Sequence, residues 1–72
     1  KSKEAISHYQ TAIKLRPLYT EAHYNLANIL FQIGEMKKAV DHYKETLRLR
    51  PYLISAQKNL DKALLLTDKM TK

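Results

Sequence analysis

The sequence contains no cysteine and no tryptophan, and only one glycine and two prolines among its 72 residues. Without cysteine, the chain can form neither a disulfide nor a thiolate metal site, and its redox compartment stays undetermined. No apolar run approaches the ~18 residues of a membrane-spanning helix, and no stretch resembles a cleavable signal. We therefore expect no membrane insertion and a cytoplasmic location. A chain this short is near the limit at which a core can hold a fold without covalent staples.

Acidic residues are scarce relative to basic ones, since 7 Asp and Glu stand against 13 Lys and Arg and give a net charge of +6. A positive chain attracts acidic partners, such as acidic peptide tails, anionic lipid or nucleic acid. The basic residues that lie at or just past expected helix C-termini, where the helix dipole favours cations, are Lys14, Arg16, Arg48 and Arg50. The others are scattered, as is typical of a solvated surface. We therefore do not expect nucleic acid to be the principal partner.

A period of 34 residues runs through the chain. Pro17 and Pro51 are 34 positions apart, and thirteen of the thirty-eight residue pairs at this offset are identical. Unrelated positions would match roughly one time in fifteen. The identical pairs include Ala5 with Ala39, His8 with His42, Tyr9 with Tyr43, Leu15 with Leu49, Arg16 with Arg50, Ala22 with Ala56, Asn25 with Asn59 and Leu26 with Leu60. This period predicts stacked units, none of which can bury its apolar face alone, and favours a binding surface over a catalytic centre.

Three strong breakers, Pro17, Gly34 and Pro51, divide the chain into four stretches with helical periodicity. The predicted helices run from about Ser2 to Leu15, from Thr20 to Ile33, from Met36 to Leu49, and from Ile54 toward Lys69. The expected core-facing residues are Ala5, Ile6, Tyr9, Ala12 and Ile13 in the first helix, Met36, Ala39, Val40, Tyr43 and Leu47 in the third, and Ala56, Leu60, Ala63, Leu64 and Met70 in the fourth. The first and third helices should end ahead of their prolines, whose rings disfavour helical geometry in the preceding residue.

The second helix differs from the others because it is apolar on two sides. One row contains Ala22, Leu26, Ile29, Leu30 and Ile33, and the other contains Tyr24, Ala27 and Phe31. Two rows predict a helix packed between neighbours. Gly34 can adopt the left-handed conformation that ends a helix, which would make the second and third helices antiparallel. In the fourth helix, Asp61 and Asp68 stand where the second has Ala27 and Gly34, so we expect its outer face to be wet.

These residues resemble the tetratricopeptide repeat (TPR) family. Over the segment from Thr20 to Leu53, the positions at which that family has apolar, small or turn-forming residues are occupied by Ala22, Tyr24, Asn25, Leu26, Ala27, Gly34, Ala39, Tyr43, Leu47 and Pro51. Departures from the pattern are His23 for the usual tryptophan, Met36 for tyrosine and Thr46 for alanine. The resemblance predicts three segments: residues 1–19 as the second helix of an incomplete unit, 20–53 as a complete unit, and 54–72 as a first helix that caps the stack.

The resemblance implies an all-α fold of four helices, arranged as a right-handed α-solenoid of antiparallel helix pairs. It also implies a protein–protein interaction scaffold, here a fragment of a longer protein, and not an enzyme. No cysteine nucleophile, glycine-rich phosphate loop or metal-binding His/Glu motif is present, so we expect no catalytic residue, no cofactor and no metal. His8 and His42 occupy equivalent points of the repeat, and His23 should be partly buried because it stands in for a large aromatic.

The polar residues left over after the apolar rows are assigned suggest a peptide-binding site. The candidate residues are Tyr24, Asn25, Asn28, Phe31 and Gln32 on the second helix and Lys58, Asn59 and Lys62 on the fourth. Asparagine amides donate and accept at once, which suits the backbone of an extended peptide. The two lysines would favour an acidic peptide or a free C-terminus. Asn25 and Asn59 are similar to the asparagine ladder in the TPR arrays of enzymes that attach N-acetylglucosamine to proteins.

Several alternatives stay open from the sequence. Asparagine and lysine on a helix surface can simply keep that face solvated, without binding a ligand. The positive charge allows a basic helical-repeat module that binds RNA, and the chain could be an engineered or excised TPR scaffold without a ligand. Because the first helix lacks a partner on one side, we also expect self-association through its uncovered apolar row.

Overall fold

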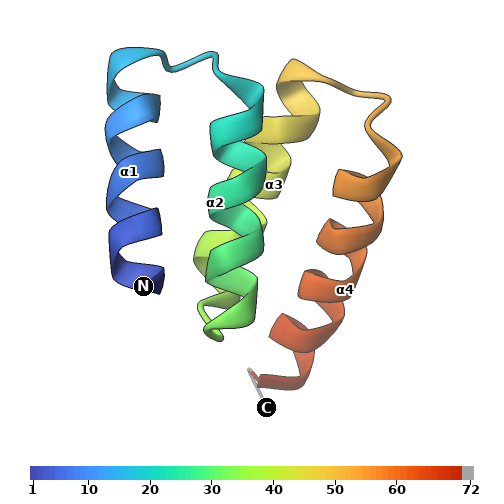
Figure 1. Cartoon of the computed structure of the whole chain (residues 1–72). Helices are drawn as coiled ribbons and strands as arrows, with labels where there is room; N and C mark the ends of the chain where they lie inside the picture. The colour runs from blue at the N-terminus through green and yellow to red at the C-terminus, as the bar shows by residue number, and fades with distance from the viewer. Residues whose placement is uncertain (71–72) are drawn as a thin grey trace.

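The computed structural model describes the backbone of residues 1–70 and the side chains of residues 1–68. The four helices are α1 (Ser2–Leu15), α2 (Thr20–Gln32), α3 (Met36–Leu49) and α4 (Ile54–Met70). No strand occurs within residues 1–70, which confirms the expected all-α fold. Each helix runs antiparallel to the one before it, so the start of α1 and the end of α4 lie at the same end of the molecule (Figure 1). The right-handed sense of the expected solenoid stays a prediction.

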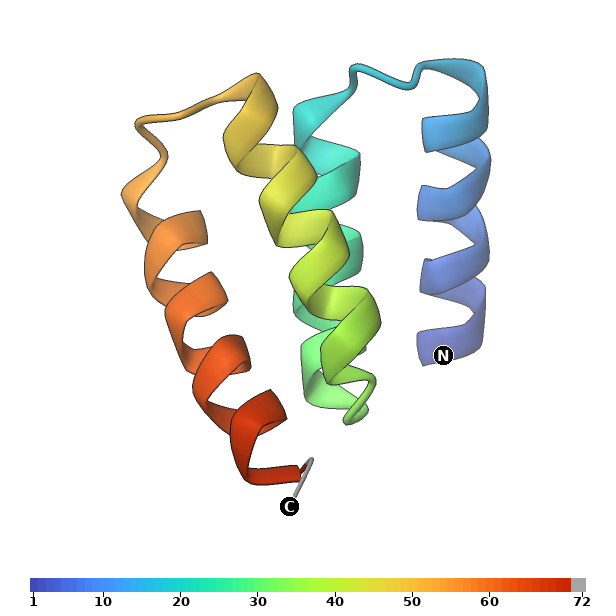
Figure 2. The ribbon, with the colours of Figure 1, turned by 180° about the vertical axis from the view of Figure 1, so that it is seen from behind.

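Helix α2 occupies the centre of the arrangement. It packs against α1, α3 and α4, whereas α1 contacts α2 alone. Figure 1 shows α1, α2 and α4 side by side with α3 behind them, and Figure 2 shows α3 in front. The molecule measures 37 × 29 × 15 Å, so it is a thin slab. The two apolar rows of α2 follow from this position, because a helix with neighbours on several sides must be apolar on more than one face.

Prolines end α1 and α3 in the same way. Arg16 has φ −140° and ψ 81°, and Arg50 has φ −135° and ψ 84°, so both are extended as expected before a proline. The backbone N–H of each arginine still donates to a carbonyl four residues earlier, from Ala12 and Thr46 respectively, at 2.8 Å in both cases. The connections α1–α2 and α3–α4 therefore start alike and lie at the same end of the molecule (Figure 1).

Gly34 makes the turn between α2 and α3. Its φ of 88° is the only positive φ among the described residues. The Gly34 N–H donates to the carbonyl of Phe31 at 3.1 Å, and the Glu35 N–H donates to the carbonyl of Leu30 at 2.8 Å. These two bonds form a Schellman motif, in which the residue after the helix adopts the left-handed conformation. The sequence placed the glycine and the antiparallel turn correctly.

The core is a seam shared by α2, α3 and α4. Its buried members are Leu26, Ala27 and Leu30 from α2, Ala39, Val40 and Tyr43 from α3, and Leu60 and Ala63 from α4, with Ile6, Tyr9 and Ile13 of α1 packed against them. Ala27, Ala39 and Ala63 are completely buried. Small side chains at these points allow the helix backbones to approach closely, and each unit contributes apolar surface that only a neighbour can cover.

Two expected core residues are exposed, and Asp61 and Asp68 on the outer face of α4 are exposed as expected. Ile33 is 48% exposed because α2 ends at Gln32 and Ile33 lies beyond its last turn. Leu64 is 39% exposed, whereas its repeat equivalent Leu30 is buried, because α4 lacks a further unit on its other side. Leu65 is also exposed, at 63%. The side chain of Met70 lies outside the described residues.

The apolar row of α1 is half-buried. Ile6, Tyr9 and Ile13 pack against the core from one side. The exposed side chains of α1 are polar except Leu15.

We predict that Gly34→Ala destabilises the fold by about 1–2 kcal/mol, because an L side chain strains a left-handed backbone. A Cβ at this position would meet no atom within 4 Å, so the cost comes from the backbone alone. Gly34→Asn should cost less, since asparagine tolerates this conformation. Urea unfolding followed by circular dichroism measures both variants, and an alanine variant as stable as the parent would contradict the assignment.

Candidate functional site

A hollow of about 350 Å³ opens between α2 and α4, and we name it the α2–α4 hollow. Its lining residues are Asn28, Phe31 and Gln32 from α2, Tyr43 from α3, and Asn59 and Lys62 from α4. Tyr24 adjoins this set through a contact of its hydroxyl with Asn59. The hollow lies where α2 and α4 are neighbours, and α3 packs against both of them.

A hydrogen-bond network fixes the polar groups of the hollow. The Tyr43 hydroxyl donates to Asn28 Oδ1, and Asn59 Nδ2 donates to the same oxygen at 3.1 Å. Asn59 Nδ2 also lies 3.4 Å from the Tyr24 hydroxyl oxygen. Asn28 Oδ1 therefore accepts two bonds, which orients the amide. Within the described residues, the Asn28 Nδ2 hydrogens and Asn59 Oδ1 have no partner, so one donor group and one acceptor remain for a ligand.

Tyr43 acts as a fixed donor beneath the hollow. Burial and the neighbouring Tyr24 raise the pKa of Tyr43 to about 12, and a hydrogen bond with Asn59 opposes the shift. The hydroxyl therefore keeps its proton at any physiological pH and continues to donate to Asn28. The rings of Tyr24 and Tyr43 are 6.2 Å apart and tilted by 60°, an arrangement that aromatic pairs favour.

The structure brings together six of the eight residues predicted for the site. Tyr24, Asn28, Phe31, Gln32, Asn59 and Lys62 lie in or beside the α2–α4 hollow. Asn25 is half-buried outside this lining, so Asn59 contacts Asn28 rather than its own repeat equivalent. Lys58 lines a different hollow at the start of α4. Tyr43 was predicted as a core-facing residue and was missed as a residue of the site. Its side chain is buried, and its hydroxyl donates to Asn28.

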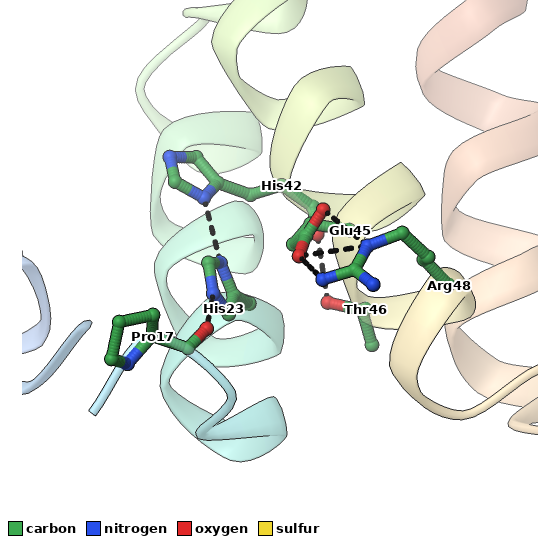
Figure 3. A network of polar contacts seen from close by, with 6 residues as sticks. All are labelled: Pro17, His23, His42, Glu45, Thr46 and Arg48. Atoms are coloured by element: carbon green, nitrogen blue, oxygen red, sulfur yellow. Dashed lines mark hydrogen bonds and ion pairs between the residues drawn. The ribbon is translucent and has the colours of Figure 1, made fainter.

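A second polar cluster joins α2 and α3 (Figure 3). His23 Nδ1 lies 3.3 Å from His42 Nδ1, and His23 Nε2 lies 2.9 Å from the carbonyl oxygen of Pro17. His23 is buried, as expected, and His42 is half-buried. In the same view, Arg48 pairs with the exposed carboxylate of Glu45, and the Arg48 guanidinium lowers the pKa of Glu45.

The contacts of His23 assign the positions of the imidazole protons. The Pro17 carbonyl can only accept, so His23 Nε2 must carry a hydrogen. In the neutral ring, Nδ1 is then an acceptor and takes a bond from His42 Nδ1–H. His23 thereby ties the α1–α2 connection to both α2 and α3.

The contact between these histidines was missed from the sequence, which paired His42 with His8 through the repeat. His8 is exposed on α1 and takes no part. The available signal was the antiparallel turn at Gly34, because residues at similar distances before and after it face each other across α2 and α3. His23 and His42 meet this condition. Within the described residues, no group of three or more His, Asp or Glu side chains is placed to hold a metal ion.

A family model described as tetratricopeptide repeat matches residues 1–54 of the 72. The chain belongs to the tetratricopeptide repeat family. TPR units generally mediate protein–protein interaction and typically act as scaffolds rather than as catalysts. No curated protein is significantly similar to the chain. No helix within the described residues has the length and apolarity needed to cross a bilayer.

We predict that the TPR chain loses stability as the pH falls from about 6.5 to about 5.5, a range above the usual carboxylate pKa values. Burial and the neighbouring His23 lower the pKa of His42, and nearby Asp41 and Glu45 oppose this. The unfolded chain therefore binds a proton at His42 more readily than the folded chain. Stability is complete above about pH 6.5 and declines below it.

Urea unfolding at several pH values measures this dependence. His42→Gln should flatten it, while His8→Gln, on the exposed face of α1, should leave it unchanged. A pH dependence that survives in the His42 variant would show that other groups cause it.

Proposed function

We propose that this chain binds an extended peptide segment of a partner protein in the α2–α4 hollow, as an interaction module without catalytic activity of its own. In this proposal, residues 20–53 form one complete TPR unit, residues 1–19 are the second helix of an incomplete unit, and residues 54–72 are the first helix of the next. The chain would be a part of a longer scaffold. The observation that carries the proposal is the pair of unpartnered amide groups, Asn28 Nδ2 and Asn59 Oδ1, in the hollow.

These two groups are complementary to a peptide bond. A peptide carbonyl can accept from Asn28 Nδ2, and a peptide N–H can donate to Asn59 Oδ1. Because both ligand groups belong to the backbone, such contacts would bind many sequences. The amides are already oriented by Tyr43 and by each other, so little conformational freedom is lost on binding.

Selectivity would come from the residues around the amides. Lys62 has no carboxylate partner within the described part of the chain and lines the hollow, so it would favour an acidic side chain or a free C-terminus. Phe31 offers an apolar wall beside the exposed amide of Gln32. A longer peptide would reach Lys58, which lies one helical turn before Lys62.

We predict that Asn28→Asp weakens peptide binding by about tenfold or more, because it removes the free N–H donors and places a charge opposite a peptide carbonyl. The substitution keeps an oxygen that can accept from Tyr43 and Asn59, so the fold should survive. Asn25→Asp is the matched control, since it makes the same change on the same helix outside the lining. Peptides selected from a random display library on the full chain are then measured by fluorescence anisotropy.

The outcomes separate the proposal from its rivals. If Asn25→Asp and Asn28→Asp weaken peptide binding equally, the α2–α4 hollow is not the binding site. Preference for an acidic peptide or a free C-terminus should fall with Lys62→Gln more than with Lys58→Gln. The RNA-binding alternative would be favoured instead if single-stranded RNA bound more tightly than any selected peptide. Its affinity should then fall tenfold or more between about 50 and 200 mM salt.

Self-association through α1 is a separate proposal. The apolar row of α1 is half-buried because α2 is its only neighbour, and a second copy could cover the rest. We expect the sedimentation coefficient to rise with protein concentration and Leu15→Lys, at the exposed apolar residue of α1, to reduce the rise. A sedimentation coefficient that stays at the monomer value at high concentration would contradict it.

A further inference from the structure

A second hollow, of about 540 Å³, lies at the end of the molecule where the α1–α2 connection meets the end of α3, and we name it the loop hollow. Its lining consists of Arg16, Pro17, Leu18, Tyr19, Thr20, Glu21 and Arg50. None of these residues lines the α2–α4 hollow. Its size is within the roughly 300–1,000 Å³ range of small-molecule sites.

Two arginines with no ionic partner face the loop hollow. Arg16 and Arg50 are repeat equivalents, and both are exposed. Neither pairs with a carboxylate of the described residues, whereas nearby Arg48 pairs with Glu45. Glu21 is the single acidic residue in the lining, and it forms no ion pair with either arginine. The lining therefore has one positive charge in excess, and within the described residues neither guanidinium group is paired with a carboxylate.

The loop hollow is shaped before any ligand arrives. The Tyr19 N–H donates to the Arg16 carbonyl at 2.9 Å, and the Arg16 guanidinium lies 5.3 Å from the centre of the Tyr19 ring. His23 donates to the Pro17 carbonyl at 2.9 Å and so ties this connection to α2 (Figure 3). On the other side, the backbone of Arg50 is bonded to Thr46.

We propose that the loop hollow binds the phosphorylated side chain of a partner protein. A phosphate monoester carries a charge of about −1.5 to −2 at neutral pH and three acceptor oxygens. Two guanidinium groups match both the charge and the acceptors, because arginine donates to phosphate through paired N–H groups. A carboxylate offers two acceptor oxygens instead of three, so it would satisfy fewer of the guanidinium donors than a phosphate does. Phosphorylation of the partner would thus control its binding at a position separate from the α2–α4 hollow.

The lining favours a single phosphate over a nucleic-acid strand. A strand needs a row of cations and aromatic rings free to stack on successive bases. Here two arginines meet in one hollow that also contains a carboxylate, and the ring of Tyr19 already lies against Arg16. The exposed Tyr52 belongs to the lining of other hollows.

The test uses a short peptide with one phosphoserine, its unphosphorylated form and its glutamate form, each titrated into the full chain by isothermal calorimetry. The phosphopeptide should bind best, and inorganic phosphate should compete with it. Arg16→Gln and Arg50→Gln should each weaken binding about tenfold, because a hydrogen-bonded charge is lost. Glu21→Gln should tighten binding, because it removes the opposing carboxylate.

Arg48→Gln is the matched control, since it removes the same charge from a neighbouring arginine outside the lining. Asn28→Asp tests independence from the α2–α4 hollow and should leave phosphate competition unchanged. The proposal would be overturned if Arg48→Gln weakened phosphopeptide binding as much as Arg16→Gln does. It would also be overturned if the phosphorylated and unphosphorylated peptides bound equally well. The proposal would also be overturned if a single-stranded oligouridine bound more tightly than the phosphopeptide and this binding disappeared in the Arg16 and Arg50 variants.

Discussion

The core depends on the packing of α2, because α1 contacts no other helix and α3, the main neighbour of α4, packs against α2. Ala27 is completely buried on this helix, and its small side chain leaves room for the backbones around it. Leu26 and Leu30 fill the adjoining space against α3 and α4. Without α2, the apolar faces of α1 and α4 would have no common partner, since these helices do not contact each other. Both candidate binding sites also use residues of α2, so their geometry depends on the same packing.

Polar contacts across the seam determine how the helices align. On one side of α2, His23 meets His42, and on another, Asn28 accepts from Tyr43. No buried side-chain nitrogen or oxygen among the described residues lacks a hydrogen-bond partner. A shift of α3 along α2 would break both contacts and leave buried polar groups unpaired, which is more costly than a comparable slip between purely apolar faces. The apolar seam supplies the attraction, and these contacts select one alignment.

Local signals in the sequence were sufficient for the elements but not for their contacts. Pro17, Gly34 and Pro51 act on their own backbone neighbourhood, so the helix ends and the antiparallel turn could be predicted. The same holds for the apolar rows, apart from residues such as Leu64 whose burial depends on a neighbour that α4 does not have.

The site was predicted less completely because side chains meet according to the alignment of two helices. Asn28 and Asn59 were both predicted for the site, and both line the α2–α4 hollow, whereas Asn25, the repeat equivalent of Asn59, lies outside the lining. Asn25 and Asn28 are three positions apart, which separates them by about 60° around the helix and about 4.5 Å along it and takes the Asn25 amide out of the lining. The histidine contact and the buried hydroxyl of Tyr43 depend on the same alignment, which the 34-residue period does not encode.

The attachment of α1 to α2 alone has a consequence for how the chain comes apart. In a stack held by nearest neighbours, each terminal helix can open without disturbing elements that it does not contact. Helix α1 has no completely buried side chain, whereas α2, α3 and α4 share the seam. Peeling of α1 would uncover one face of α2 and leave the three-helix remainder intact, with the Asn28–Asn59 contact undisturbed. The first step of unfolding would therefore be a local fraying rather than a global, all-or-none transition.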